Sequence, residues 1–321
     1  MPDNQHSFEQ LSKVMTFWDE KYGEKFKGYV HPYRERSTFD NLANFYRAIA
    51  EFNDTTSSTV ACDLGCWLGF PCLLENADTG CTVYGIEIQE SFTETAREWS
   101  AHIDARNLRF HAMREGVVPL PGASVDWVLV NQVLCNALAD TFPNSIREAA
   151  RILKPGGTLI ICDSNNPYHE PVRARLKRTY HNAETGNGSL EAPAGHNFRA
   201  RKTMIQAVAP GLSAESVSML ALGTCYMHGL QIRAAVQDFV HNGRKPVSLF
   251  NPDTLDTPLL PHNGAALGNL TNPYLLARIA QEAGLQVTIN TALTRQPLSP
   301  SDLYDSLQNS GSFYVIAEKK A

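Results

Sequence analysis

The chain has 321 residues, a formal net charge of −5 and a sequence pI near 6.1, values that provide no general attraction for nucleic acid or an anionic membrane. Hydrophobic residues make up 43% of the chain and charged residues 19%, as in an ordinary soluble globular protein. The polar N-terminal stretch lacks the pattern of a signal or transit peptide, and no apolar run is long enough to span a bilayer. We therefore expect a cytoplasmic protein without a membrane or DNA partner, built as one large domain with an insertion or as two domains.

The first part of the chain has the periodicity of helices. Apolar residues recur at three- and four-residue spacing between residues 8 and 52, which predicts an N-terminal helical cap over residues 1–57. His31-Pro32 interrupts this pattern, because proline disfavours helix at the residue before it. The periodic residues are Leu11, Val14, Met15 and Trp18 before the break, and Leu42, Phe45, Tyr46 and Ile49 after it.

Short apolar segments then alternate with helical ones across residues 58–167. This alternation predicts parallel strands that are covered by helices on both faces, which is a doubly wound α/β core. The expected strands are 59–64, 82–88, 108–113, 125–134 and 158–163, and the expected helices are 71–80, 91–104 and 144–153.

The alternation stops over residues 168–271, which are mainly helical in pattern and carry most of the positive clusters. It resumes with a helix over 272–285, where Asn272 can cap the first turn, and continues with strands over 286–293 and 311–320. We expect residues 168–271 to form a helical insertion after the fifth strand, acting as a substrate lid. Residues 272–321 would complete the core sheet.

The cysteines are odd in number and scattered singly through apolar segments. Cys62 and Cys66 are four residues apart, but Cys62 belongs to an expected strand and no second ligand pair follows. We therefore expect buried thiols in a reducing compartment, with neither disulfides nor a metal. The seven positions are Cys62, Cys66, Cys72, Cys81, Cys135, Cys162 and Cys225.

The turn after the first expected strand reads "DLGCWLG", residues 63–69, and it lacks the phosphate-binding pattern G-x-G-x-x-G. Asp63 precedes Gly65 by two residues, a position where its charge disfavours phosphate and favours a cation. Glu87 ends the second strand, close to where a ribose-binding acid is expected in this fold. The two acids suit a phosphate-free ligand with a ribose and a positive amino-acid end, and S-adenosylmethionine fits that description.

Four further segments follow "DLGCWLG" in chain order, namely "VYGIEI", "VPLPGASVDWVLVNQVL", "EAARILKPGGTLIICD" and "GSFYVIAEK". Together the five segments resemble the motifs of the class I S-adenosylmethionine-dependent methyltransferases. The resemblance covers residue 59 to about 167, and residue 272 to the C-terminus. It implies an enzyme that uses S-adenosylmethionine, with a doubly wound, mostly parallel seven-stranded sheet whose last strand is antiparallel.

The resemblance also implies roles for residues at the strand ends. Asp63, Gly65 and Gly69 would hold the methionine end of the cofactor. Glu87 would bind the ribose, and Ile88 would pack on the adenine.

Met113 and Arg114 occupy positions where many relatives have Gly-Asp, the aspartate reaching the adenine amino group. An arginine cannot accept that hydrogen bond, so Glu115 is the alternative partner. Asn131 would lie near the methionine portion of the cofactor. Trp67 replaces the middle glycine of the family motif, and its ring either faces the sulfonium or simply packs.

Methyl transfer to an oxygen usually requires a general base. The candidates are Asp163 at the end of the fifth strand, His169 just beyond it, and His228 in "TCYMHGL". Ligands in this fold bind outside the carboxyl ends of the strands, which favours Asp163 and His169. The structural alternatives are a helix or turn cap for Asp163 and a solvent-facing side chain for His169.

Three residues are expected to contact the acceptor. Tyr33 and Arg34 belong to "YVHPYRER", which would fold over the cofactor as a lid, and Tyr168 ends "SNNPY". We expect "SNNPY" to be a turn and not the similar motif of amino-methylating enzymes. The clusters "RARLKR" and "NFRARK" form either a solvated helix face or a grip for a carboxylate or phosphate on the acceptor.

The sequence therefore predicts an S-adenosylmethionine-dependent methyltransferase that acts on a small-molecule or saccharide acceptor, at a hydroxyl. Within the enzyme class, the alternative is N-methylation of a small amine or an RNA nucleotide. A methyltransferase-fold protein that binds the cofactor without turnover is the alternative outside that class. The sequence leaves open whether the protein is a homo-oligomer.

Overall fold

Seven strands form one sheet in the order β3-β2-β1-β4-β5-β7-β6, which confirms the predicted doubly wound, mostly parallel fold. Strands β1 to β5 are parallel, and β7 runs antiparallel between β5 and β6. The strands are β1 (Val60–Leu64), β2 (Thr82–Glu87), β3 (Leu108–Ala112), β4 (Val125–Asn131), β5 (Leu153–Asp163), β6 (Leu285–Asn290) and β7 (Phe313–Lys319). The computed structural model describes residues 5–23, 30, 33–187, 193–247, 257–262, 264 and 266–321.

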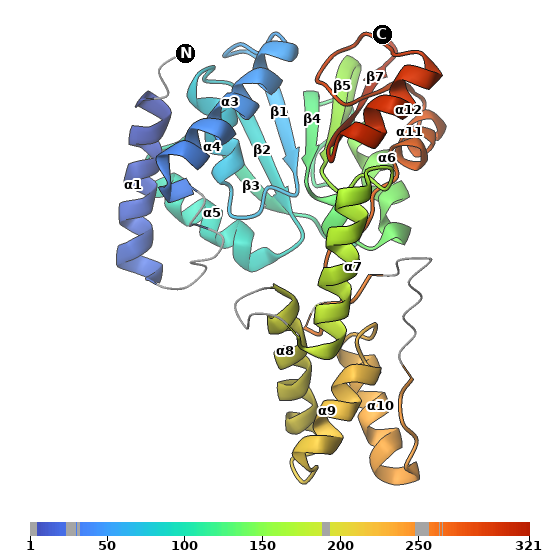
Figure 1. Cartoon of the computed structure of the whole chain (residues 1–321). Coiled ribbons are helices and arrows are strands. Elements are labelled where there is room, and N and C mark those ends of the chain that lie inside the picture. Colours follow the sequence, from blue (N-terminus) through green and yellow to red (C-terminus); the bar gives the residue numbers. More distant parts are fainter. Residues whose placement is uncertain are drawn as a thin grey trace.

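Helices cover both faces of this sheet (Figure 1). Because successive strand residues point to opposite faces, Ala61 and Cys62 of β1 belong to two different buried clusters. The cluster of Ala61 is built with α1 (Gln5–Tyr22), α3 (Arg36–Phe52), α4 (Phe70–Ala77) and α5 (Glu90–His102). The cluster of Cys62 is built with α6 (Phe142–Ile152), α11 (Pro273–Glu282) and α12 (Pro300–Asn309). Two short 3-10 turns, η1 (Leu134–Asn136) and η2 (Ala139–Thr141), link β4 to α6.

Between β5 and α11 the chain leaves the sheet and forms a group of helices at the carboxyl ends of the parallel strands (Figure 1). Helix α7 leads away from the sheet, and the other three helices have a small apolar core of their own. These helices are α7 (Glu170–Thr185), α8 (Pro193–Val208), α9 (Ala214–Gly223) and α10 (Gly229–Asn242). The core residues are Ile205, Val217, Leu220, Ala221, Ile232 and Val236.

Two elements differ from the sequence prediction. Strand β5 begins at Leu153, so it includes the "KPGG" segment, which lies outside the strand predicted over 158–163. Leu153 pairs with Val125, and the next pair is Trp127 with Thr158. The register therefore shifts between these pairs, as in a β-bulge, and the extra residues of β5 include the two glycines. Helix α12 was not predicted, although the Ser299 side chain accepts a hydrogen bond from the Asp302 amide at 3.2 Å and Pro300 occupies the first turn.

Arg201, part of the predicted basic cluster "NFRARK", is fully buried and holds the insertion together. Its Nε atom donates to the Ala221 carbonyl at 2.9 Å, and its other nitrogens donate to the Asn197 side chain and the Ala183 carbonyl. The guanidinium therefore links α7, α8 and α9. It is not available to bind an acceptor.

Replacing this guanidinium should destabilise the insertion. We expect Arg201→Ala to lower the free energy of unfolding by about 2–4 kcal/mol, because it strands several buried acceptors. Urea denaturation measures the change, and hydrogen exchange of α7 to α9 locates it. Arg199→Ala, an exposed change on the same helix, is the control. Equal stability of the two variants would contradict the prediction.

Candidate functional site

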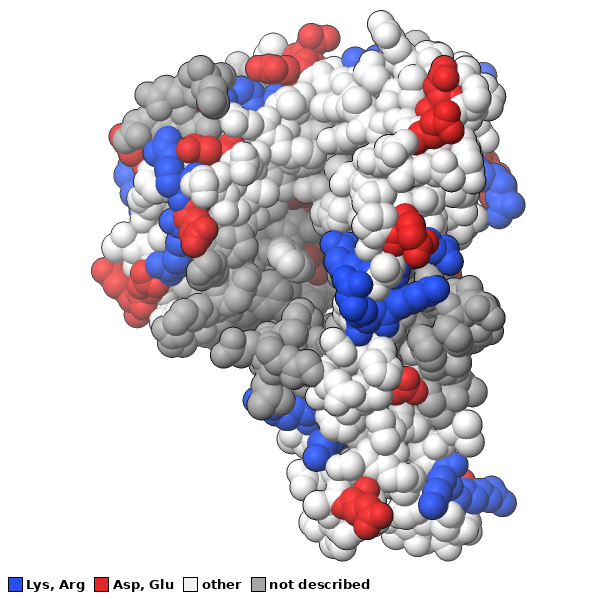
Figure 2. Space-filling model, viewed as in Figure 1, with Lys and Arg blue, Asp and Glu red and all other residues white. Residues whose placement is uncertain are grey.

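The candidate site lies at the carboxyl ends of β1 and β4, where the strand order reverses. Open α/β sheets bind ligands at such a point, because the connections leave the two strands in opposite directions. Figure 2 shows a hollow at this level, between the N-terminal half of the core and α7. Lys and Arg side chains gather on its α7 side.

The turn between β1 and α4 depends on two glycines in the left-handed region. Gly65 has φ +94° and Gly69 has φ +83°. A Cβ at Gly65 would lie 2.4 Å from a methyl of Val133, and one at Gly69 would lie 2.6 Å from the Phe110 ring. Both positions therefore require glycine, for conformation and for space.

Glu87 is 6% exposed, and its carboxylate accepts three backbone hydrogen bonds. Oε1 accepts from the amides of Ile88 at 2.8 Å and Gln89 at 3.1 Å, and Oε2 accepts from the amide of Trp67 at 3.1 Å. Burial raises the pKa of Glu87, and the three amides oppose that shift. Since a carboxylate has about four acceptor sites, one remains on Oε2 for a ligand hydroxyl.

The residues expected around an adenine lie in different environments. Ile88 directly follows Glu87 and is 71% exposed, so its side chain is available to pack on a flat ring. Met113 is half-buried, and its amide donates to the Glu87 carbonyl at 2.8 Å. Arg114 is exposed and forms an ion pair with Glu90 at 2.7 Å. Arg114 is thus held at the surface by α5.

Asp63 lies at the end of β1 and is 3% exposed. The Cys72 thiol donates to its Oδ2 at 3.7 Å. Burial raises the pKa of Asp63 to about 7; the Cys72 hydrogen bond opposes this shift and the negative charge of Glu87 adds to it. A nearby cation would restore the ionised form of Asp63.

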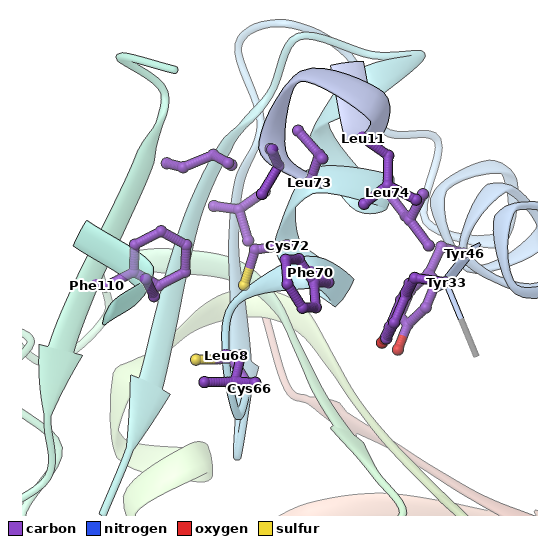
Figure 3. Packing of buried hydrophobic residues seen from close by; sticks show 14 of the residues in the cluster. Leu11, Tyr33, Tyr46, Cys66, Leu68, Phe70, Cys72, Leu73, Leu74 and Phe110 are labelled. Carbon is purple, nitrogen blue, oxygen red and sulfur yellow. The ribbon is translucent and has the colours of Figure 1, made fainter. Parts of the chain in front are cut away.

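Two buried tyrosines stand beside Asp63, and their hydroxyl groups point the same way in Figure 3. Tyr33 packs 4.9 Å from the Phe70 ring, and the Tyr46 hydroxyl accepts a hydrogen bond from Asn131 Nδ2 at 3.2 Å. Burial raises the pKa of both phenols, and the Asp63 charge adds to it, so they stay protonated at neutral pH. The structure thereby groups Tyr33, Asn131 and Asp63 at the strand ends.

The three candidate bases lie in three different surroundings. The buried Asp163 carboxylate accepts from the amides of Asn165 at 3.0 Å and Cys135 at 3.1 Å, which is the geometry of a turn cap. His169 faces the loop before β7, where a Cβ at Gly311 would lie 3.4 Å from its Nδ1 atom. His228 is the N-cap residue of α10 in the insertion. A general base therefore stays a prediction without geometric support.

Three other predicted residues lie outside the group around Asp63. Arg34 pairs with Asp19 through two hydrogen bonds, one of them at 3.0 Å. Tyr168 packs edge-on against Tyr274 and Tyr304, and it sits in the expected turn before α7. The Trp67 ring is 46% exposed at φ +52°, so it is not packed in the core.

Two residues beside Asp63 carry no site prediction from the sequence. Tyr46 was assigned only to the periodic face of a helix, and Glu75 was not singled out at all. Glu75 lies three residues after Cys72 on α4, in an apolar stretch, and is 1% exposed. A carboxylate at a core position of an apolar helix was the signal that could have identified it.

Comparison with known proteins identifies the domain that holds this site. Residues 62–161 match a family model described as "Methyltransferase domain". The matched segment contains the glycine turn, Glu87 and strands β2 to β4, with most of β1 and β5. Residues 62–161 are thus similar to a methyltransferase domain, in agreement with the sequence resemblance to the class I S-adenosylmethionine-dependent methyltransferases.

Each alignment with a curated relative spans only part of this chain and part of the relative. The chain is 28% identical over 153 residues to bovine tRNA N(3)-cytidine methyltransferase METTL2, which is 46% of this chain and 40% of that protein. It is 29% identical over 125 residues to demethylmenaquinone methyltransferase of Tropheryma whipplei (strain Twist), covering 39% of this chain and 50% of that protein. The chain therefore spans half or less of the length of these curated relatives.

A solved structure matches over most of the chain. The PH0226 protein from Pyrococcus horikoshii OT3 covers 89% of this chain and 93% of its own, with a TM-score of 0.50 and 13% identity. At that identity the likeness concerns the fold alone. Among the described residues, no helix has the length and apolarity needed to cross a membrane.

The glycine turn provides a direct test of the site. We expect Gly65→Ala to weaken S-adenosylmethionine binding by roughly tenfold or more, about 1.4 kcal/mol, because the new Cβ would displace Val133. Isothermal titration calorimetry measures the affinity. Gly211→Ala, at a loop glycine with open space around it, is the control. Unchanged affinity in Gly65→Ala would contradict this assignment.

The raised pKa of Asp63 predicts how stability depends on pH. An acid whose pKa is higher in the folded state than in the unfolded state contributes stability at low pH, and this contribution is lost as pH rises through about 7. We expect the melting temperature to fall by a few degrees between pH 5 and pH 8, and to fall less in Asp63→Asn. Differential scanning calorimetry checks both slopes. Identical slopes would exclude Asp63 as a source of the dependence.

Proposed function

We propose that this protein is an S-adenosylmethionine-dependent methyltransferase whose acceptor is a small molecule with an anionic group. The observation that carries the proposal is the fixed carboxylate of Glu87 next to the exposed side chain of Ile88. An acid for the ribose and an apolar surface for the adenine suit the adenosine part of the cofactor. The raised pKa of Asp63 fits a site that is completed by a positively charged ligand.

The turn amides also support a ligand without phosphate. The amides of Gly65 and Cys66 donate to the Ile86 carbonyl at 2.7 and 3.1 Å, and the amide of Trp67 donates to Glu87. A phosphate-binding turn keeps such amides directed at its ligand. Here they are used inside the protein, as expected for a site that binds a cation.

The acceptor class follows from the charges on α7. This helix carries Arg173, Arg175, Lys177 and Arg178, and basic side chains line the α7 side of the hollow (Figure 2). Arg175 donates to the Asn165 side chain at 2.8 Å, and its charge acts on Cys135 in η1, the turn that follows β4. Arg175 therefore lies close to the strand ends, where a carboxylate or phosphate of an acceptor would be bound. In this proposal the insertion, residues 168–271, is the lid over that acceptor.

The hydroxyl predicted as the methylated group remains part of the proposal, with saccharides included in the acceptor class. One relative, by its name, modifies tRNA cytidine, which supports RNA as the second candidate acceptor. The negative net charge of this chain favours the small molecule, because tRNA binding requires an extended positive surface.

Glu87 is the residue to change in a test of the cofactor assignment. We expect Glu87→Gln to weaken S-adenosylmethionine binding by about 1–3 kcal/mol, because its NH2 group would face the Trp67 amide, a donor against a donor, and could not accept the ribose hydroxyl. Titration calorimetry measures the affinity, with melting curves to monitor folding. Glu94→Gln, an exposed change on α5, is the control. An unaltered dissociation constant would remove the ribose assignment.

The acceptor requires a product assay. Release of S-adenosylhomocysteine is measured with a pool of anionic metabolites and sugars, and separately with total RNA. Release with the metabolite pool alone supports the proposal, and release with RNA alone favours the second candidate. Cofactor binding without release on either pool would favour a binding protein and overturn the proposed activity.

A further inference from the structure

Directly beneath the glycine turn lies a buried pair of acids, Asp63 of β1 and Glu75 of α4. Single ligand atoms of Asp63, Cys72 and Glu75 all lie within 4.8 Å of one another. Glu75 is 1% exposed, and neither of its carboxylate oxygens has a hydrogen-bond partner in the described part of the chain. Cys72 and Glu75 are three residues apart on α4, which places both on the side of the helix that faces β1.

Among the described residues, no lysine or arginine charge acts on either acid. In the part of the chain that the structure describes, Arg47 is the cation that lines the pocket between α3 and α4, beside Glu75, and its guanidinium is 2.8 Å from Asp78. The other described groups whose charge acts on the pair, or on which the charge of the pair acts, are neutral or negative at pH 7. They are the thiols of Cys62, Cys66, Cys72 and Cys81, the phenols of Tyr33 and Tyr46, and the carboxylate of Glu87.

Two carboxyl groups this close in a buried site cannot both be ionised at low cost, so one of them keeps a proton. The directions of the pKa shifts agree with this geometry. Burial raises the pKa of Glu75, and the charge of Asp63 adds to the rise. An uncompensated buried charge is therefore avoided in the free protein only by protonation.

We propose that Glu75 is a specificity-determining residue of the cofactor site: with Asp63 it shares a proton in the free protein, and this proton is released when the positively charged cofactor binds. The inference rests on the proposed function. In the balanced equilibrium, protonated protein and S-adenosylmethionine give the complex and one proton. No covalent bond changes. Glu75 acts through Asp63 and is a positioning residue, not a catalytic one.

Loss of the proton leaves both acids ionised, and the ionised site should bind the cofactor more tightly than the product. S-adenosylmethionine carries a sulfonium charge, and S-adenosylhomocysteine has a neutral thioether in its place. An ionised acid pair stabilises the first more than the second, so the preference for cofactor over product increases with pH. A product that binds weakly relative to the cofactor is released more readily after methyl transfer.

The test is titration calorimetry of both ligands from pH 6 to pH 8.5, in pairs of buffers with different ionisation enthalpies. For the natural protein we expect up to tenfold tighter S-adenosylmethionine binding per pH unit, levelling above the titration of the pair. The buffer dependence should report proton release. The affinity for S-adenosylhomocysteine should change by a smaller factor.

Glu75→Gln removes the acid that shares the proton with Asp63, so binding of S-adenosylmethionine should release fewer protons and its affinity should depend less steeply on pH than in the natural protein. Glu51→Gln, an exposed acid at the same pocket, is the control and should behave as the natural protein. If Glu75→Gln does not fold, proton release by the natural protein still decides the question.

Three outcomes would overturn the inference and leave the proposed function intact. They are cofactor binding without proton release, equal pH slopes for the two ligands, and a stoichiometric metal ion on the purified protein, measured by mass spectrometry. Absence of S-adenosylmethionine binding at every pH would overturn both the inference and the proposed function.

Discussion

The hydrogen bond from the Trp67 amide to the Glu87 carboxylate joins the two strand ends on which the site depends. It ties the glycine turn after β1 to the end of β2 at 3.1 Å, and the amides of Ile88 and Gln89 fix the same carboxylate from its own side. A buried carboxylate is stable only with such donors. The position of the Glu87 carboxylate is therefore set by backbone geometry before any ligand binds.

That constraint explains why the turn is built from left-handed residues. Trp67 reaches Glu87 only because the chain reverses sharply between Gly65 and Gly69, and neighbouring side chains occupy the space where larger residues would place a Cβ. Trp67 itself adopts φ +52°, so the substituted family position keeps the turn conformation although it carries a large ring. The site is thus rigid in its backbone and retains a large exposed side chain at its edge.

Electrostatics separates this site from a nucleotide site of the same architecture. Two buried acids lie close together under the turn, and Glu87 adds a third carboxyl group. Basic residues lie on α7 at the other side of the hollow and are supported by the packing of the insertion around Arg201. A cationic cofactor and an anionic acceptor would therefore be held on opposite sides of the same crevice.

The sequence by itself determined the alternation of strands and helices and the positions of Asp63, Gly65 and Glu87. The hydrophobic periodicity, the spacing of the glycines and the ends of the strands are all properties of short segments of the chain. It also led to the methyltransferase family, which the family match then supported. It missed α12, a helix in which only Leu307 is buried, because so narrow an apolar face leaves little periodic signal.

The tertiary structure decided what each polar side chain meets, since the partners come from distant elements. Asp163 accepts hydrogen bonds from two backbone amides, one after β4 and one after β5. Arg201 is buried and links the helices of the insertion. Glu75 was placed against Asp63 by the packing of α4 on β1. Hydrogen-bond partners and burial depend on contacts between residues far apart in the chain, and no local pattern encodes them.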